Sequence, residues 1–309
     1  MYSLLHCHFE SALRALDLAR PERVHHLRAL YRTPGYLGSS PAERLTLLWR
    51  TVLSLTEDDE EIFAESTFHL VVQRLLAEMR ASQVEHADLR IGPSTGRWRW
   101  MRSAADGIDI FRKELAGSHD LSIAFLAGIN MTKPADELDA LFDLLLTDGE
   151  LTARLAGVDV NFLAADLPKF NRYLTALQAL QTAGLKVNIH LGELFGNEIS
   201  HHVLSQITPD RIGHGVLLLH DQYLVEMIKE RDVCLDMCPT SNTLLGVTDW
   251  THHSPASRAL QLGIPVSINT DDPVLFRTDI DREIHRAGLT DGQRDMVVAC
   301  AKRYRYGTS

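Results

Sequence analysis

The chain has 309 residues, of which 45% are hydrophobic and 23% are charged, and its formal net charge is −10 at pH 7. This length suits one large domain or two modest ones, and the acidic balance argues against binding to nucleic acid or to an anionic membrane through bulk electrostatics. No run of about 20 apolar residues is present, and the N-terminal segment lacks the basic start and long apolar core of a signal peptide. The four cysteines do not suggest a disulfide framework in so long a chain, so we expect a cytoplasmic protein.

Short apolar runs alternate along the chain with longer segments that are apolar at helical spacing. Eight of the runs are predicted to be strands, at residues 2–6, 84–91, 121–129, 157–162, 186–191, 211–215, 233–238 and 265–269. Strands that alternate with helices form a parallel sheet, and eight such units predict an α/β fold of the (β/α)8 type, a TIM barrel. An open doubly wound sheet is the alternative, although no glycine-rich phosphate loop follows the first strand. We predict a single domain over residues 1–309.

The interval between the first two predicted strands, residues 9–82, is much longer than the other intervals. Two segments within it, residues 43–55 and 58–79, are apolar at helical spacing. We therefore predict a helical, cap-like insertion between strands 1 and 2. It would serve either as an extra packing layer or as a substrate lid over the barrel mouth.

Histidines and carboxylates stand at the ends of four predicted strands, and the residues concerned are His6, His8, His190, Glu193, His214, Asp271 and Asp272. Alternate residues of a strand face the same side, so both histidines of the HCH motif can point into one cavity. The functional groups of a parallel barrel converge at the carboxyl ends of its strands. Polar groups at four separate strand ends therefore indicate one shared site.

The residue types at these strand ends suit a metal-dependent hydrolase. Three imidazoles and one carboxylate are good ligands for a divalent borderline metal, and zinc is the leading choice. We predict that one Zn²⁺ per chain is bound by a set of four residues, His6, His8, His190 and Asp271. Zinc lowers the pKa of a bound water from ~15.7 towards ~7, so hydroxide becomes available at neutral pH. His214 would orient that hydroxide or accept its proton, Glu193 would donate a proton to the substrate, and Asp272 would hydrogen-bond the substrate.

Five motifs carry a resemblance to a known family: in chain order they are LHCHFESAL, IHLGE, RIGHG, CPTSN and INTDDP. Together they resemble adenosine/adenine deaminase-like enzymes of the amidohydrolase superfamily, over residues 5–273. The resemblance implies a (β/α)8 barrel with one zinc. It also implies hydrolytic removal of an exocyclic amine as ammonia, by attack of zinc-bound hydroxide on an adenine-type purine such as adenosine, adenine or a modified aminopurine.

The same resemblance assigns roles by motif position. The four predicted ligands take the metal roles, Glu193 resembles the acid that protonates a ring nitrogen, and His214 resembles the residue that activates hydroxide. Asp272 resembles the acceptor of a hydrogen bond from the substrate ring, and Gly192 resembles the glycine that lets the backbone approach the ring. The CPTSN segment has no assigned role, and its Asn242 is expected to shape a turn behind the site.

Two departures from the family pattern concern substrate recognition. Glu10 stands in the acidic position after the HCH motif. A glutamate at this position resembles the adenine deaminases, whereas the adenosine deaminases have a shorter Asp that resembles a contact to a sugar hydroxyl. Asn161 and Phe162 replace the small pair that normally faces the purine. We expect all three residues to contact the substrate and to make unmodified adenosine a poor substrate. The alternative is that Phe162 packs into the barrel core.

Two other functions remain open from the sequence. The altered end of the fourth strand also suits a metal-binding scaffold protein with reduced catalysis. The same activated water would also serve a hydrolase of another amino-heterocycle, or of an amide or ester. Under each hydrolase hypothesis the partner is a small molecule, with neither nucleic acid nor membrane involved.

Overall fold

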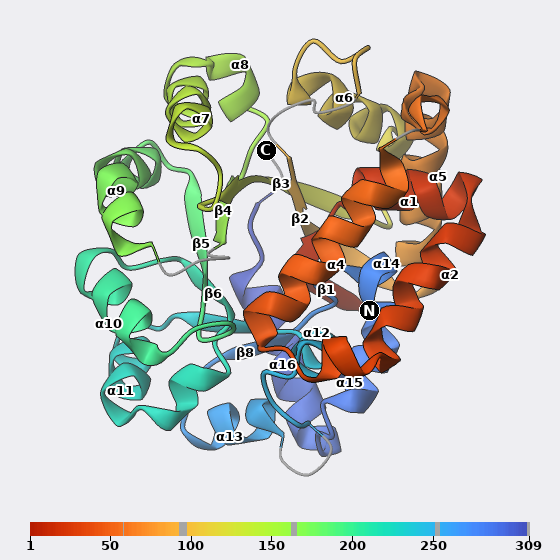
Figure 1. Ribbon diagram of the computed structural model, residues 1–309. Helices are drawn as coiled ribbons and strands as arrows, with labels where there is room; N and C mark the ends of the chain where they lie inside the picture. The colour runs from red at the N-terminus through yellow and green to blue at the C-terminus, as the bar shows by residue number, and fades with distance from the viewer. Residues whose placement is uncertain (58, 93–97, 162–165, 251–253, 308–309) are drawn as a thin grey trace.

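The barrel that the strand pattern predicts is present in the structure. The computed structural model describes residues 1–57, 59–92, 98–161, 166–250 and 254–307. Eight parallel strands follow one another in chain order (Figure 1), and they are β1 (Tyr2–His8), β2 (Val84–Ile91), β3 (Ser122–Asn130), β4 (Gly157–Asn161), β5 (Lys186–Leu191), β6 (Arg211–His214), β7 (Cys234–Met237) and β8 (Val266–Ile268). A parallel bridge between Cys7 and Asp271 joins β1 to the segment after β8, so the sheet closes into a TIM barrel.

The strand predictions differ from the structure mainly at the strand ends. The sequence predicts that the first strand ends at residue 6, whereas β1 continues to His8 because its pairing with β2 continues to Arg90. Both histidines of the HCH motif therefore lie within the strand. The predicted last strand, residues 265–269, is shortened to Val266–Ile268.

Helices in the connections surround the barrel. Outside the insertion the helical elements are α6 (Ala104–Leu115), α7 (Ala135–Thr147), α8 (Gly149–Thr152), α9 (Leu167–Thr182), α10 (Asn197–Gln206), η3 (Leu217–His220), α11 (Gln222–Glu230), α12 (Pro239–Leu245), α13 (Pro255–Gln261), α14 (Pro273–Phe276), α15 (Ile280–Arg286) and α16 (Asp291–Tyr304). Helix α16 begins with a capping box between Thr290 and Gln293, and it packs on β8 and β1. Within the described parts of the chain, no helix has the length and apolar character needed to cross a membrane.

The segment between β1 and β2 is helical, as predicted. It contains α1 (Ser11–Ala19), α2 (Pro21–Ala29), η1 (Leu30–Arg32), α3 (Pro34–Leu37), α4 (Pro41–Thr56), η2 (Glu60–Phe63) and α5 (Glu65–Ala81). The prediction of one helix over residues 58–79 was wrong, because extended backbone at Ala64 separates η2 from α5; residue 58 lies outside the described residues.

The insertion packs against elements that follow the last two strands. Helix α4 contacts α12, and α1 contacts α14, so the insertion lies beside the carboxyl ends of β7 and β8 (Figure 1, red to orange). Its role as a cap over the barrel mouth stays a prediction.

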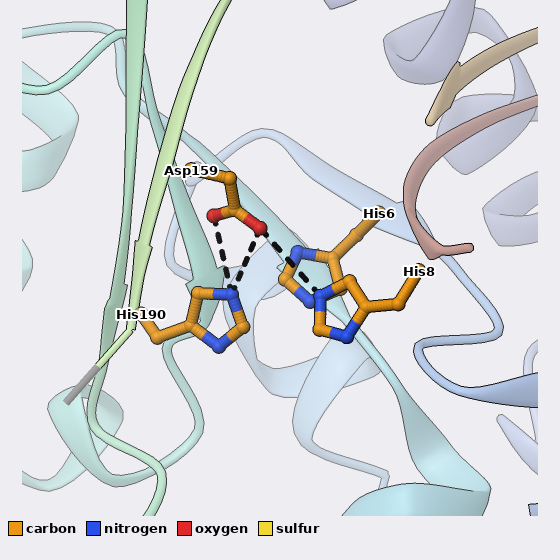
Figure 2. A group of neighbouring side chains, drawn as sticks. All are labelled: His6, His8, Asp159 and His190. Carbon is orange, nitrogen blue, oxygen red and sulfur yellow. Dashed lines mark hydrogen bonds and ion pairs between the residues drawn. The ribbon is translucent and has the colours of Figure 1, made fainter. Parts of the chain in front are cut away.

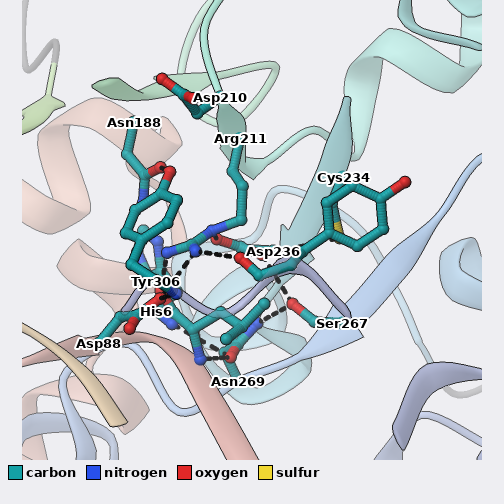
Figure 3. Close-up of polar contacts among 12 residues, drawn as sticks. His6, Asp88, Asn188, Asp210, Arg211, Cys234, Asp236, Ser267, Asn269 and Tyr306 are labelled. Carbon is teal, nitrogen blue, oxygen red and sulfur yellow. Dashed lines mark hydrogen bonds and ion pairs between the residues drawn. The ribbon is translucent and has the colours of Figure 1, made fainter. Parts of the chain in front are cut away.

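A buried arginine organises the barrel interior (Figure 3). Arg211, the first residue of β6, is 0% exposed, and its guanidinium lies 2.7 Å from Asp88 Oδ2 and 2.8 Å from Asp236 Oδ2. These carboxylates come from β2 and β7, so one cation links three strands across the barrel. Taking a charge out of water is costly unless it is paired, and here each of the charges has a partner.

The C-terminal segment inserts an aromatic ring into the same layer. Tyr306 is 7% exposed, and the Arg211 guanidinium carbon lies 3.8 Å from its ring centroid. The Tyr306 hydroxyl donates a hydrogen bond to Asn188 Oδ1, and its backbone N–H donates one to Asp88 Oδ2 at 3.3 Å. The segment after α16 is therefore tied to β5 and β2 through the barrel interior.

Replacing the central arginine tests how strongly this layer stabilises the fold. Arg211→Met leaves Asp88 and Asp236 buried without their cation, so we expect the free energy of unfolding to fall by about 3–5 kcal/mol. Denaturant unfolding measures the change. The control is Arg172→Met on α9, which removes a half-exposed guanidinium paired with Asp139 and should have little effect. Equal stability of the two variants would contradict this role for Arg211.

Candidate active site

The histidines and carboxylates that the sequence singles out meet at the carboxyl ends of the strands. The ring centroid of His6 lies 4.9 Å from that of His8, 4.5 Å from that of His190 and 5.1 Å from that of His214. Asp271 Oδ1 lies 3.6 Å from His6 Nε2 and 3.2 Å from His8 Nδ1. All five residues are buried. The structure therefore brings the four predicted metal ligands and the predicted base into one cluster.

The backbone is strained at two of these positions. His214 has φ 64° and Asp271 has φ 58°, in the left-handed region that residues other than glycine rarely adopt. Such a conformation costs about 1–3 kcal/mol and persists only where the surroundings enforce it. At Asp271 two hydrogen bonds do so, because its N–H donates to the His6 carbonyl at 3.1 Å and its carbonyl accepts from the His8 N–H at 2.7 Å. The same pairing that closes the barrel thus fixes the position of this carboxylate.

One carboxylate of the cluster was missed by the sequence analysis. Asp159 of β4 lies between two histidine rings (Figure 2), with its carboxylate oxygens 3.2 Å from His190 Nε2 and 3.5 Å from His8 Nε2. Four ligand atoms, one each from His6, His8, Asp159 and His190, lie within 4.8 Å of one another, whereas Asp271 groups with His6 and His214 or with His8 and Asp272. The sequence contained a signal for Asp159. Alternate residues of a strand face the same side, and Asp159 stands two residues before Asn161, which is predicted to face the substrate.

The charges around Asp159 hold it ionised. Burial alone would raise the pKa of this carboxyl, but the neighbouring His190 and His8 hold it well below its usual range. Arg90 Nε also lies 3.2 Å from Asp159 Oδ2, so β2 supplies a fixed cation behind the carboxylate. Asp159 is therefore placed to orient two of the imidazoles.

The imidazoles of the cluster differ in their proton affinity. Burial, together with the neighbouring His190, lowers the pKa of His6 to about 4, which leaves its ring neutral and able to bind a metal. For His8, burial is outweighed by the Asp272 and Asp271 carboxylates, which raise its pKa to about 10. The ring of His8 thus lies where the carboxylates favour positive charge.

The predicted acid and base lie next to each other. Glu193 Oε1 is 3.5 Å from His214 Nε2, and Glu193 Oε2 is 4.0 Å from His190 Nδ1. Burial raises the pKa of Glu193, although the neighbouring His190 opposes the shift. A carboxyl with a raised pKa keeps its proton nearer to neutral pH, as a general acid must. Burial lowers the pKa of His214 to about 3, so its ring is neutral.

The CPTSN segment contacts the predicted base. Asn242 of α12 lies with its side-chain Nδ2 3.1 Å from His214 Nδ1, inside the buried cluster. The expectation that Asn242 only shapes a turn was therefore incomplete. Its amide holds the ring of His214 and sets which ring nitrogen carries the proton.

The predicted substrate-binding residues differ in their placement. Asp272 Oδ1 lies 3.2 Å from His8 Nδ1, so this residue joins the cluster. Gly192 has φ 63°, and a Cβ atom there would lie 2.7 Å from Leu218 Cγ, so only glycine fits. Asn161 ends β4, and its buried Oδ1 has no hydrogen-bond partner among the described residues. Phe162 lies outside the described residues, and so its predicted contact with substrate stays a prediction.

Glu10 is buried beside the cluster without a hydrogen-bond partner. It is 6% exposed, and neither carboxylate oxygen is hydrogen-bonded within the described structure. Arg14 Nε lies 3.4 Å from Oε2. Burial, opposed by Arg14, raises the pKa of this carboxyl to about 8. Buried oxygens in this state can accept hydrogen bonds from a ligand.

A comparison with protein families identifies the family of the chain. The family model described as adenosine deaminase matches residues 58–297, more than half of the chain. The chain belongs to the adenosine deaminase family. This confirms the resemblance seen in the motifs. Because the match begins after β1, the placement of His6 and His8 rests on the structure itself.

Two curated relatives and one solved structure extend this assignment. The chain is 29% identical to an adenine deaminase of Rhizobium rhizogenes over 94% of this chain and 88% of that protein. It is 27% identical to an aminodeoxyfutalosine deaminase of Streptomyces coelicolor over 76% of this chain, and spans 60% of the length of that relative. The crystal structure of an adenine deaminase from Arthrobacter aurescens matches with a TM-score of 0.74 and 21% identity, over 100% of this chain and 94% of that chain. The structural likeness confirms the barrel fold.

The contact between Asn242 and His214 can be tested with a neighbouring control. Asn242→Leu keeps the size of the side chain but leaves His214 Nδ1 without its partner, so we expect the rate of ammonia release to fall by about 10²-fold or more. Ser241→Ala on the same helix removes a buried hydroxyl that has no hydrogen-bond partner in the described structure, and should leave the rate nearly unchanged. Equal rates for the two variants would show that Asn242 does not position His214.

Proposed function

We propose that this protein is a zinc-dependent hydrolytic deaminase that removes the exocyclic amine of an adenine-type purine as ammonia. The observation that carries the proposal is the buried cluster in which His6, His8 and His190 lie with Asp159, Asp271 lies against His6 and His8, and the Glu193–His214 pair lies beside them. A scaffold protein without catalysis would have no use for that pair. The substrate is a small aminopurine or a related amino-heterocycle.

The residues of the cluster fit a divalent cation. The Nε2 atoms of His6 and His8 are buried and have no hydrogen-bond partner among the described residues. Buried nitrogen atoms of this kind are normally satisfied, and a metal would use their lone pairs. We assign the metal to His6, His8, His190 and Asp271, with Asp159 orienting two of the rings. Nitrogen and oxygen donors in this combination suit zinc.

When bound, the metal would supply a water of lowered pKa as the nucleophile near neutral pH. The chain's own residues would handle the protons. His214 would orient the attacking water through Nε2, which carries the proton of the neutral ring because Nδ1 accepts a hydrogen bond from Asn242 Nδ2. Glu193 would hold a proton at a carboxylate oxygen and deliver it to a ring nitrogen of the purine. Asp272 would accept a hydrogen bond from the same ring.

Two variants distinguish the proton-transfer role of Glu193 from a role in metal binding. Glu193→Gln should keep the metal, since this residue is not an assigned ligand, and should slow ammonia release by ~10²–10⁴-fold. Asp271→Ala should lower both the metal content and the rate. Elemental analysis and a coupled ammonia assay give the two readouts. Near-full activity of Glu193→Gln on the true substrate would exclude this residue as the acid.

Substrate choice depends on Glu10. We expect adenine or a substituted aminopurine to be turned over better than adenosine, because Glu10 reaches one methylene farther than the Asp that resembles a sugar contact. Comparison of kcat/KM for adenine and adenosine in the wild type and in Glu10→Asp tests this, and the shorter side chain should shift preference towards adenosine. Adenosine turnover by the wild type with kcat/KM in the typical range of about 10⁴–10⁸ M⁻¹s⁻¹ would contradict the assignment.

A further inference from the structure

A large cavity of the molecule is lined by residues other than those of the candidate active site. It has a volume of about 1000 Å³ and is bordered by η1 of the insertion, α12, α14 and α15. None of its lining residues in the described structure belongs to the predicted metal, catalytic or substrate-binding set. Its volume is in the range of cavities that bind small organic ligands, about 300–1000 Å³.

The wall of this cavity is strongly cationic. Arg32, Arg277 and Arg286 line it, and none of the three has an ion-pair partner among the described residues. His285 lines it as well, as does Arg282, which is paired with Asp279 at 3.2 Å, and Asp281 is the sole carboxylate in the described lining. In a chain with a net charge of −10, such a local excess of guanidinium groups favours an anionic ligand.

One of these arginines occupies an unusual backbone conformation. Arg277 ends α14 with φ 50° and ψ 54°, the left-handed region that favours glycine. Its carbonyl accepts a hydrogen bond at 3.0 Å from Arg282 Nη1, which links two arginines of the cavity wall. Residues other than glycine that are held in this region cluster at ligand-binding and other functional positions.

Aromatic side chains form another part of the wall. Tyr31, Trp250 and Phe276 line the cavity, and the Tyr31 hydroxyl donates to the Leu275 carbonyl at 2.6 Å, which fixes its position. Trp250 is only 4% exposed, and its Nε1–H has no hydrogen-bond acceptor in the described structure. Trp250 Nε1 is closed to solvent, so the part of this side chain that lines the cavity is the apolar part of its ring.

We propose that this cavity is a second ligand site, which binds an aromatic anion of the nucleoside monophosphate class. The arginines bind the phosphate, because guanidinium groups recognise phosphate oxygens through paired hydrogen bonds. The aromatic residues contact the base. This site is separate from the deaminase site, so the proposal does not depend on the proposed function.

Uridine 5′-monophosphate is a suitable probe, because it carries a phosphate and an aromatic base but no exocyclic amine that a deaminase would remove. Isothermal titration of the full chain should show saturable binding of this nucleotide. Uridine and inorganic phosphate should each bind at least about tenfold more weakly, because each lacks half of the recognised groups. Binding should also weaken as salt is raised.

Variants locate the binding. Arg277→Gln and Arg286→Gln should each weaken binding of the nucleotide by about tenfold or more. The control Arg172→Gln removes a guanidinium from α9 and should leave binding unchanged.

Three results would overturn the proposal. They are no detectable binding of the nucleotide, binding that the cavity variants leave unchanged, and binding of inorganic phosphate as tight as that of the nucleotide. The second result would place the nucleotide elsewhere on the molecule, and the third would exclude a role for the aromatic wall. Because these readouts are affinities for a nucleotide that cannot be deaminated, they stand whatever the result of the ammonia assays.

Discussion

The structure depends on a concentration of buried carboxylates that needs positive charge. Asp159, Asp271, Asp272 and Glu193 lie at one end of the barrel with little access to water, and Arg90 is the guanidinium paired there. Buried charges are costly unless they are paired or bind a metal. The imidazoles among them supply part of this positive charge, because two of the carboxylates raise the pKa of His8 and favour its charged form. A divalent cation would satisfy the cluster and leave the histidines neutral.

The barrel makes this arrangement possible by holding the strand ends rigidly. The backbone bonds between β1 and Asp271 both close the sheet and aim the carboxylate into the cluster. Beneath it, Arg211 and Tyr306 tie β2, β5, β6 and β7 together through the interior. The strain at Asp271 is sustained by the two backbone hydrogen bonds to β1. The two strained residues thus lie above a buried layer in which Arg211 is paired with both Asp88 and Asp236.

Much of this architecture follows from simple patterns. Alternating strands and helices predict the barrel, and polar groups at the strand ends predict which side chains meet there. Asp159 escaped this reasoning because it lies inside a strand rather than after one. Asn242 escaped because it lies on a helix, where spacing along the chain does not report contact with His214. The separation of η2 from α5 at Ala64 depends on an extended backbone conformation, which the spacing of apolar residues does not predict.

The most direct test of the account is a crystal structure of the chain grown with zinc and measured at the zinc absorption edge. The account predicts one strong anomalous peak per chain, in contact with ring nitrogens of His6, His8 and His190 and with a carboxylate oxygen of Asp271. Absence of a peak at this cluster, with the four side chains well ordered, would contradict the assignment of a metal centre. A peak bound by other residues would contradict it equally.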